Sequence, residues 1–201
     1  MTRFMSRAEV EGIVCSGECR GRQHTYALLD ERVPPTPELT KEEALARLAT
    51  AYFRSHAPAT LQDFSWWSGL PLTEARQSIS LIEPKLMSEQ WNSQTWYIHD
   101  SCRTSGKATG NLHLLPPYDE YLIGYKDRTD VLPKEDYSKA FTNNGLFFPV
   151  LLYKGHVVGN WNKASKKKEI FPEHSLFRKD ICLKEELLNQ AKEKYVRFLI
   201  H

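Results

Sequence analysis

Between Lys41 and His99 the sequence alternates helical and strand patterns, and this order constrains the fold more than any other part of the chain. Residues 41–56 place apolar side chains three and four positions apart, as on one face of a helix: Ala44, Leu45, Leu48, Ala49, Tyr52 and Phe53. Pro58 ends this helix. Thr60, followed three residues later by Asp63, is a capping signal for a second helix.

A third helix and a hairpin complete the pattern. Gly69 ends the second helix, and residues 73–82 place Ala75, Ile79 and Ile82 on one face of the next. Two strand-like runs follow, KLMSEQW and QTWYIH, joined by the polar turn pair Asn92-Ser93. Three helices and a β-hairpin form a winged helix-turn-helix, in which the third helix reads DNA and the hairpin is the wing. We therefore predict an α+β fold of tandem winged-helix units.

The first 35 residues have the pattern of an incomplete unit of the same kind. Residues 3–12 read as a helix, and the strand-like runs GIVCS and HTYALL follow it around a Gly-rich turn. This is the last third of a winged helix without its first two helices. Residues 33–37, VPPTP, predict an extended linker. The first domain is thus predicted over residues 1–35 and the complete winged helix over 36–100.

The remaining half begins at a polar, Gly- and Ser-rich loop, residues 101–111. LFFPVLLY and HVVGNWN predict a hairpin, with Pro149 indicating an edge strand or a bulge, and KKKEIF predicts a third strand. The closing segment predicts an amphipathic helix with an apolar face formed by Leu183, Leu187, Leu188, Ala191, Tyr195 and Phe198. We assign residues 101–201 to a C-terminal α+β, winged-helix-like domain.

Composition places the chain among ordinary globular proteins. Of its 201 residues 41% are hydrophobic and 26% are charged, with no apolar stretch near the roughly 20 residues of a membrane span and no apolar core of a secretory signal at the start. We therefore expect a cytoplasmic protein that does not contact membranes. The four cysteines lack the paired spacing of a zinc site, so we expect reduced thiols, no metal and no cofactor.

Charge is unevenly distributed along the chain. Residues 1–40 carry 5 basic and 6 acidic side chains, residues 41–100 carry 5 and 7, and residues 101–201 carry 17 and 12. Binding to nucleic acid normally draws on a basic surface. The sequence therefore favours the second half, rather than the helix over 73–82, as the main phosphate-binding surface.

Several strings resemble one known family. LLPPYDEYLIGYKDR, followed by FFPVLLYKGHVVGNW, resembles the C-terminal region of the AlkZ/YcaQ-like family, and GRQHTYALLDERVPP, KEEALARLATAYFRSHAPAT and LQDFSWWSGL resemble its middle region. The family comprises winged-helix DNA-binding proteins and includes DNA glycosylases that unhook interstrand crosslinks. The resemblance implies tandem winged-helix units around a DNA channel and a role in DNA repair.

One departure from the family pattern concerns catalysis. Active members carry a Gln-x-Gln or Gln-x-Asp motif in their N-terminal unit. Neither occurs here, since no glutamine is followed two positions later by Gln or Asp; the glutamines are Gln23, Gln62, Gln77, Gln90, Gln94 and Gln190. We assign no catalytic residue and predict a non-catalytic protein that binds duplex DNA, intact or damaged. Alternatives are the C-terminal part of a DNA glycosylase whose upstream winged-helix unit supplies the chemistry, and a protein-interaction scaffold.

Candidate DNA contacts fall on the third helix and the hairpin. Arg76, Gln77 and Ser80 are expected to meet base edges or phosphates if that helix enters a major groove; the alternative is a solvated helix face. Asn92 and Gln94 at the hairpin tip are expected to meet phosphates, or else only to satisfy the turn geometry.

Further candidates lie in the second half. Tyr125, Lys126 and Arg128 combine an aromatic ring with two cations, suited to a phosphate backbone and a splayed base, with Asp127 orienting Arg128. The alternative is an Asp127–Arg128 pair that pins a loop. The densest positive run comprises Lys163, Lys166, Lys167 and Lys168, which serves either DNA binding or solubility.

Replacing Lys166, Lys167 and Lys168 with Ala is expected to weaken duplex binding similarly for all sequences. Each lost phosphate contact lowers the slope of log affinity against log salt by roughly 0.9. Titrations at several salt concentrations measure this slope. Changing Arg76 and Gln77 should have the smaller effect, and the reverse ranking would contradict the charge argument.

Overall fold

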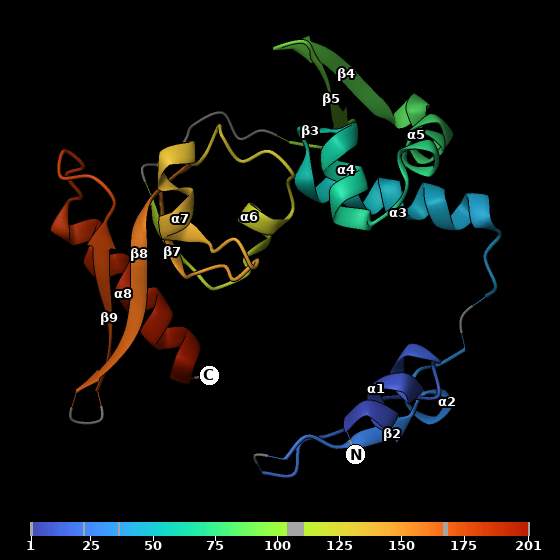
Figure 1. Cartoon of the computed structure of the whole chain (residues 1–201), viewed down its shortest axis with the longest axis horizontal. Helices are drawn as coiled ribbons and strands as arrows, with labels where there is room; N and C mark the ends of the chain where they lie inside the picture. Colours follow the sequence, from blue (N-terminus) through green and yellow to red (C-terminus); the bar gives the residue numbers. More distant parts are fainter. Residues whose placement is uncertain (1, 22, 36, 104–110, 167–168, 201) are drawn as a thin grey trace. The chain divides into compact units, whose positions relative to one another are not determined.

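The structure, a computed structural model, describes residues 2–21, 23–35, 37–103, 111–166 and 169–200. The chain divides into two compact units, residues 1–41 and 42–201 (Figure 1). The structure is mixed α and β, as predicted. None of the described helices is long and apolar enough to cross a membrane.

The N-terminal unit contains a helix and a hairpin, as predicted. Helix α1 (Thr2–Val10) precedes the antiparallel strands β1 (Val14–Ser16) and β2 (Tyr26–Leu28), and the short helix α2 (Leu29–Arg32) follows. None of the described side chains in this unit is buried, and Phe4 and Val10 are 83% and 84% exposed. The elements form without a core of their own.

The larger unit begins with the elements predicted between Lys41 and His99. They are α3 (Lys41–His56), β3 (Ala59–Thr60), α4 (Leu61–Ser68), α5 (Leu72–Leu81), the 3₁₀ turn η1 (Glu83–Lys85), β4 (Leu86–Trp91) and β5 (Gln94–His99). The strands form an antiparallel sheet in the order β3-β5-β4, and the β4–β5 hairpin extends from the helices (Figure 1).

The apolar stripes predicted for these helices form their common core. Tyr52, Phe53 and Phe64 are fully buried and pack with Ala49, Ala59, Ala75, Ile79 and Ile82. The capping box of Thr60 and Asp63 is present, and Gly69 ends α4 in the left-handed conformation with φ 72°. One position of the stripe is wrong, because Ala44, in the first turn of α3, is exposed.

The second part of the larger unit is built on a four-stranded antiparallel sheet in the order β6-β7-β8-β9. Its strands are β6 (Leu112–Leu115), β7 (Val150–Tyr153), β8 (His156–Lys166) and β9 (Glu169–Leu176). Between β6 and β7 lie α6 (Glu120–Ile123), the 3₁₀ turn η2 (Lys134–Asp136) and α7 (Tyr137–Ala140), and α8 (Glu185–Ile200) ends the chain. This order differs from that of a winged helix.

Two details of this part depart from the sequence expectations. Pro149 was predicted to indicate either an edge strand or a bulge. Strand β7 lies between β6 and β8, so it is not an edge strand. The register shift between Leu151 and Leu152 is the predicted bulge. Helix α8 packs on the sheet through Ala191 and its apolar neighbours, but Phe198 is 76% exposed. The helix thus extends past the surface that its apolar face covers.

A buried carboxylate joins two distant segments of this part. Asp136 is 3% exposed; its Oδ1 accepts a hydrogen bond from Lys139 Nζ at 2.7 Å and its Oδ2 one from Arg178 Nε at 3.3 Å. Burial alone would raise the pKa of Asp136, but the hydrogen bond and charge of Lys139 and the charge of Arg178 outweigh burial and lower it. The ionised carboxylate therefore stabilises the folded state.

We expect Asp136→Asn to lower the free energy of unfolding by about 1–3 kcal/mol at pH 7. Because the folded pKa lies below the unfolded value, this contribution is present above the unfolded pKa, near 3.8, and is lost as the pH falls through the folded pKa. Urea denaturation from pH 7 to 2.5 measures it. Asp180→Asn, at an exposed site, is the control; equal effects at pH 7 would contradict the prediction.

Candidate nucleic-acid interface

Asp63 fixes the start of α4 and the loop at Lys126 with a single carboxylate. Its Oδ2 accepts hydrogen bonds from the backbone N–H of Thr60 at 3.0 Å and from the Thr60 hydroxyl at 2.7 Å. Its Oδ1 accepts one from the backbone N–H of Lys126 at 2.9 Å. Asp63 is 3% exposed, so these bonds form away from solvent. The two parts of the larger unit are therefore joined at this residue.

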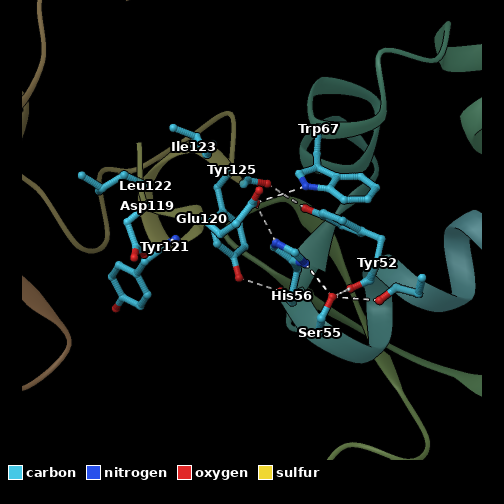
Figure 2. A network of polar contacts seen from close by, with 12 residues as sticks. Tyr52, Ser55, His56, Trp67, Asp119, Glu120, Tyr121, Leu122, Ile123 and Tyr125 are labelled. Carbon is cyan, nitrogen blue, oxygen red and sulfur yellow. Dashed lines mark hydrogen bonds and ion pairs between the residues drawn. The ribbon is translucent and has the colours of Figure 1, made fainter. Parts of the chain in front are cut away.

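A second set of contacts joins the same parts at the end of α3 (Figure 2). His56 Nε2 lies 3.2 Å from Glu120 Oε2, which also accepts a hydrogen bond from Trp67 Nε1 at 3.2 Å. The Tyr125 hydroxyl donates to the His56 carbonyl at 2.8 Å. Burial, followed by the charge of Asp63, raises the pKa of Tyr125 to about 12, so the phenol remains a donor at neutral pH.

A cleft of about 490 Å³ opens between the β4–β5 hairpin and the loop after α6, and we call it the hairpin cleft. The hairpin supplies Trp91, Asn92, Gln94 and Trp96, and the start of α4 supplies Thr60, Gln62 and Asp63. The opposite wall is formed by Lys126, Asp127, Thr129, Asp130, Lys134 and Tyr137. The cleft brings Asn92 and Gln94, predicted together at the hairpin tip, to the same surface as Lys126, which was predicted independently of them.

The hairpin tip presents an aromatic surface to this cleft. Asn92 and Ser93 both have positive φ angles, 49° and 60°, as a two-residue hairpin turn requires. Trp91, just before the turn, is 54% exposed, and its ring centroid lies 5.9 Å from that of Trp96. The indole N–H of Trp96 is buried without a hydrogen-bond partner among the described residues. Exposed indole rings are suited to stacking on nucleobases.

The charge of the cleft is mixed. Lys126 and Lys134 face three carboxylates, of which Asp63 is held by backbone and hydroxyl donors. Asp127 accepts hydrogen bonds from the backbone and side chain of Thr129, which lower its pKa, so it is ionised at neutral pH. Phosphates therefore approach only at the lysines, while the tryptophan wall suits an uncharged ring.

Arg128 does not lie on this surface, which corrects the expectation for that residue. It is 9% exposed, and its guanidinium donates to the carbonyls of Leu122 and Lys126. It lies over three aromatic rings, those of Trp66, Phe141 and Phe147, at 5.4 to 5.8 Å from the ring centroids. Desolvation lowers its pKa. The expected Asp127–Arg128 pair gives way to the Asp127–Thr129 hydrogen bonds.

The other predicted residues are dispersed. Tyr125 packs against the core of α3–α5, and its hydroxyl donates a hydrogen bond to the His56 carbonyl instead of facing solvent. Arg76, Gln77 and Ser80 are exposed on α5, where Arg76 and Ser80 line a separate groove. Lys163 is exposed on β8; the side chain of Lys166 and both Lys167 and Lys168 lie outside the described residues.

Sequence reasoning missed Trp91 and Trp96 as site residues. The available signal was the pair of tryptophans on opposite strands beside the Asn92-Ser93 turn, since paired strands bring such residues within reach of each other. Among the described residues, no three His, Cys, Asp or Glu side chains come together as a metal site would require. The four cysteines are unpaired thiols.

Comparison with known proteins identifies the family. The model of a family described as DNA glycosylase AlkZ-like matches residues 1–198. The chain belongs to the AlkZ-like DNA glycosylase family. This confirms the resemblance found in the sequence. No curated protein matches this AlkZ-like chain.

A solved structure supports the fold. Streptomyces sahachiroi DNA glycosylase AlkZ superposes with a TM-score of 0.73 at 20% sequence identity, covering 90% of this chain and 50% of that one. The AlkZ-like chain thus spans half the length of the structure that it matches.

We expect Asp63→Ala to destabilise the larger unit by about 2–4 kcal/mol, because it removes the Asp63 half of the capping box and leaves the backbone N–H groups of Thr60 and Lys126 without an acceptor. Asp127→Ala, at an exposed carboxylate of the same cleft, should cost less than about 1.5 kcal/mol. Urea denaturation of both variants followed by tryptophan fluorescence tests this. Equal losses would show that Asp63 does not join the two parts.

Proposed function

We propose that this chain binds duplex DNA, with the hairpin cleft as one contact surface, and that it does not itself break the glycosidic bond. Membership of a DNA glycosylase family supports DNA as the partner. The observation that carries the proposal is the convergence of Trp91, Asn92, Gln94 and Lys126 on one cleft, since aromatic, amide and cationic side chains are those that contact bases and phosphates.

In this proposal residues 41–99 act as a winged helix whose wing is the β4–β5 hairpin. Lys126 and Lys134 meet the phosphate backbone at the edge of the cleft, and Asn92 and Gln94 contact sugar or phosphate oxygens. Trp91 stacks on a base that is displaced from the helix, which favours damaged or distorted duplexes. The lysines of residues 163–168 add sequence-independent affinity.

A second candidate is that the chain is the DNA-holding part of an active glycosylase. The family match and the coverage of only half of the Streptomyces sahachiroi enzyme favour it. The absence of a Gln-x-Gln or Gln-x-Asp motif in these 201 residues implies that another winged-helix unit would supply the chemistry. A base-release assay on alkylated or crosslinked duplex DNA tests whether this chain is catalytic. Turnover by this chain alone would refute the non-catalytic proposal.

We expect Trp91→Ala to weaken binding to a duplex with a single-base bulge by about 5- to 150-fold, the range for loss of one base–aromatic stack of about 1–3 kcal/mol. Binding to a fully paired duplex should change less. Lys126→Ala should weaken binding to both duplexes and lower the slope of log affinity against log salt by about 0.9. Fluorescence anisotropy with labelled duplexes measures all three effects.

The matched control is Lys179→Ala, at an exposed lysine outside the cleft. Wild-type affinity in both the Trp91 and Lys126 variants would exclude the hairpin cleft as a DNA contact. No binding of either duplex by the wild-type chain at low salt would overturn the function itself.

A further inference from the structure

A second groove, of about 510 Å³, runs beside α3, and we call it the α3 groove. Its lining is formed by Ala46, Arg47, Thr50, Ala51, Arg54, Leu81, Ile82, Pro84 and Lys85. Three of these side chains are cations and none is a carboxylate. None is aromatic, so the groove offers positive charge without rings on which bases could stack.

This concentration of charge stands out against the surrounding sequence. Residues 41–100 contain five basic and seven acidic side chains, a net negative segment. Three of those five basic residues line the α3 groove, and none of the seven acidic residues does. A solvated surface that served only solubility would mix both signs along it.

The cations are arranged along the helix and its neighbours. Arg47 and Arg54 are seven residues apart on α3, which puts them on one face, about 10.5 Å apart along the axis. Lys85 ends the turn η1 on the other wall. The thiol of Cys102 lies 3.7 Å from the Phe53 carbonyl and 3.9 Å from that of Arg54, which brings Arg103 to the end of α3.

All four cations are exposed, and the structure records no ion pair for any of them among the described residues. Their positive potential is therefore uncompensated by bound carboxylates. The small side chains of Ala46 and Ala51 leave room for a close approach to α3. A polyanion with regularly spaced charges fits this description.

The α3 groove is distinct from the other candidate surfaces of this part. It shares no lining residue with the hairpin cleft. At the end of α5 and in η1, Ser80 and Glu83 line the groove beside α5, whereas Leu81 and Pro84 line the α3 groove. A contact here is additional to any contact made by the hairpin or by the exposed face of α5.

We propose that the α3 groove binds the phosphate backbone of duplex DNA, at a segment outside the one held by the hairpin cleft. This rests on the proposed function, because DNA held at the cleft presents its flanking phosphates at high local concentration. Arg47 and Arg54 lie about 10.5 Å apart along α3, so each can contact a different phosphate of the backbone. The contact carries no sequence preference and extends the binding site.

The test is a triple variant, R47Q/R54Q/K85Q, which removes three charges and keeps polar side chains of similar length. We compare it with wild type on duplexes of about 12 and about 30 base pairs. On the long duplex, the loss of three phosphate contacts should lower the slope of log affinity against log salt by about 2.7. It should also weaken binding to the long duplex at least about tenfold at low salt. Both the slope and the affinity should change little on the short duplex.

The matched control, K179Q/K184Q/K194Q, removes three exposed lysines from the C-terminal part and should retain the wild-type length dependence. Thermal unfolding checks that both variants fold. An unchanged slope on the long duplex, with the short duplex still bound, would overturn the α3 contact alone; no binding of either duplex by wild type would overturn the proposed function. Polyglutamate binding that is lost in the triple variant while long-duplex binding is kept would assign the groove to an acidic protein instead.

Discussion

The geometry of the hairpin cleft depends on the pair formed by Thr60 and Asp63. Thr60 belongs to β3 and is opposite Trp96 in the sheet, so it sets the position of the hairpin wall. The Asp63 carboxylate holds the backbone of Thr60 on one oxygen and that of Lys126 on the other, so it sets the opposite wall. The hairpin and the loop at Lys126, two separate segments of the sequence, are thus both positioned from one capped helix end.

Local signals in the sequence predicted the elements better than the surfaces. The capping box at Thr60, the left-handed Gly69 and the turn at Asn92 depend on a few neighbouring residues, so their chemistry could be recognised directly. Arg128 could not be assigned in this way. Its burial comes from Trp66, Phe141 and their neighbours, which the fold brings over it from distant positions, and no local pattern shows that a cation is covered.

The same limit applies to charge. The residue count placed the excess of basic side chains in residues 101–201. Part of that charge is not available to bind DNA, because Arg128 is buried and Lys139 and Arg178 contact Asp136. In residues 41–100 the count was negative, yet the fold separates the two signs and gathers cations along α3. The net charge of a stretch of sequence therefore predicts the charge of its surface only when the fold does not separate basic from acidic side chains.

The two surfaces differ in what they can contribute to DNA binding. Asp127 and Asp130 in the hairpin cleft repel phosphates, so the lysines of the cleft give little net attraction for DNA. Trp91 can stack on a base, and this contact depends on whether the base is displaced from the duplex. The α3 groove has cations without carboxylates or rings, so it responds to phosphates of any sequence. Under the proposed function, affinity thus comes mainly from the groove and the lysines of residues 163–168. Discrimination between intact and distorted duplex comes from the cleft, and a change in one property need not alter the other.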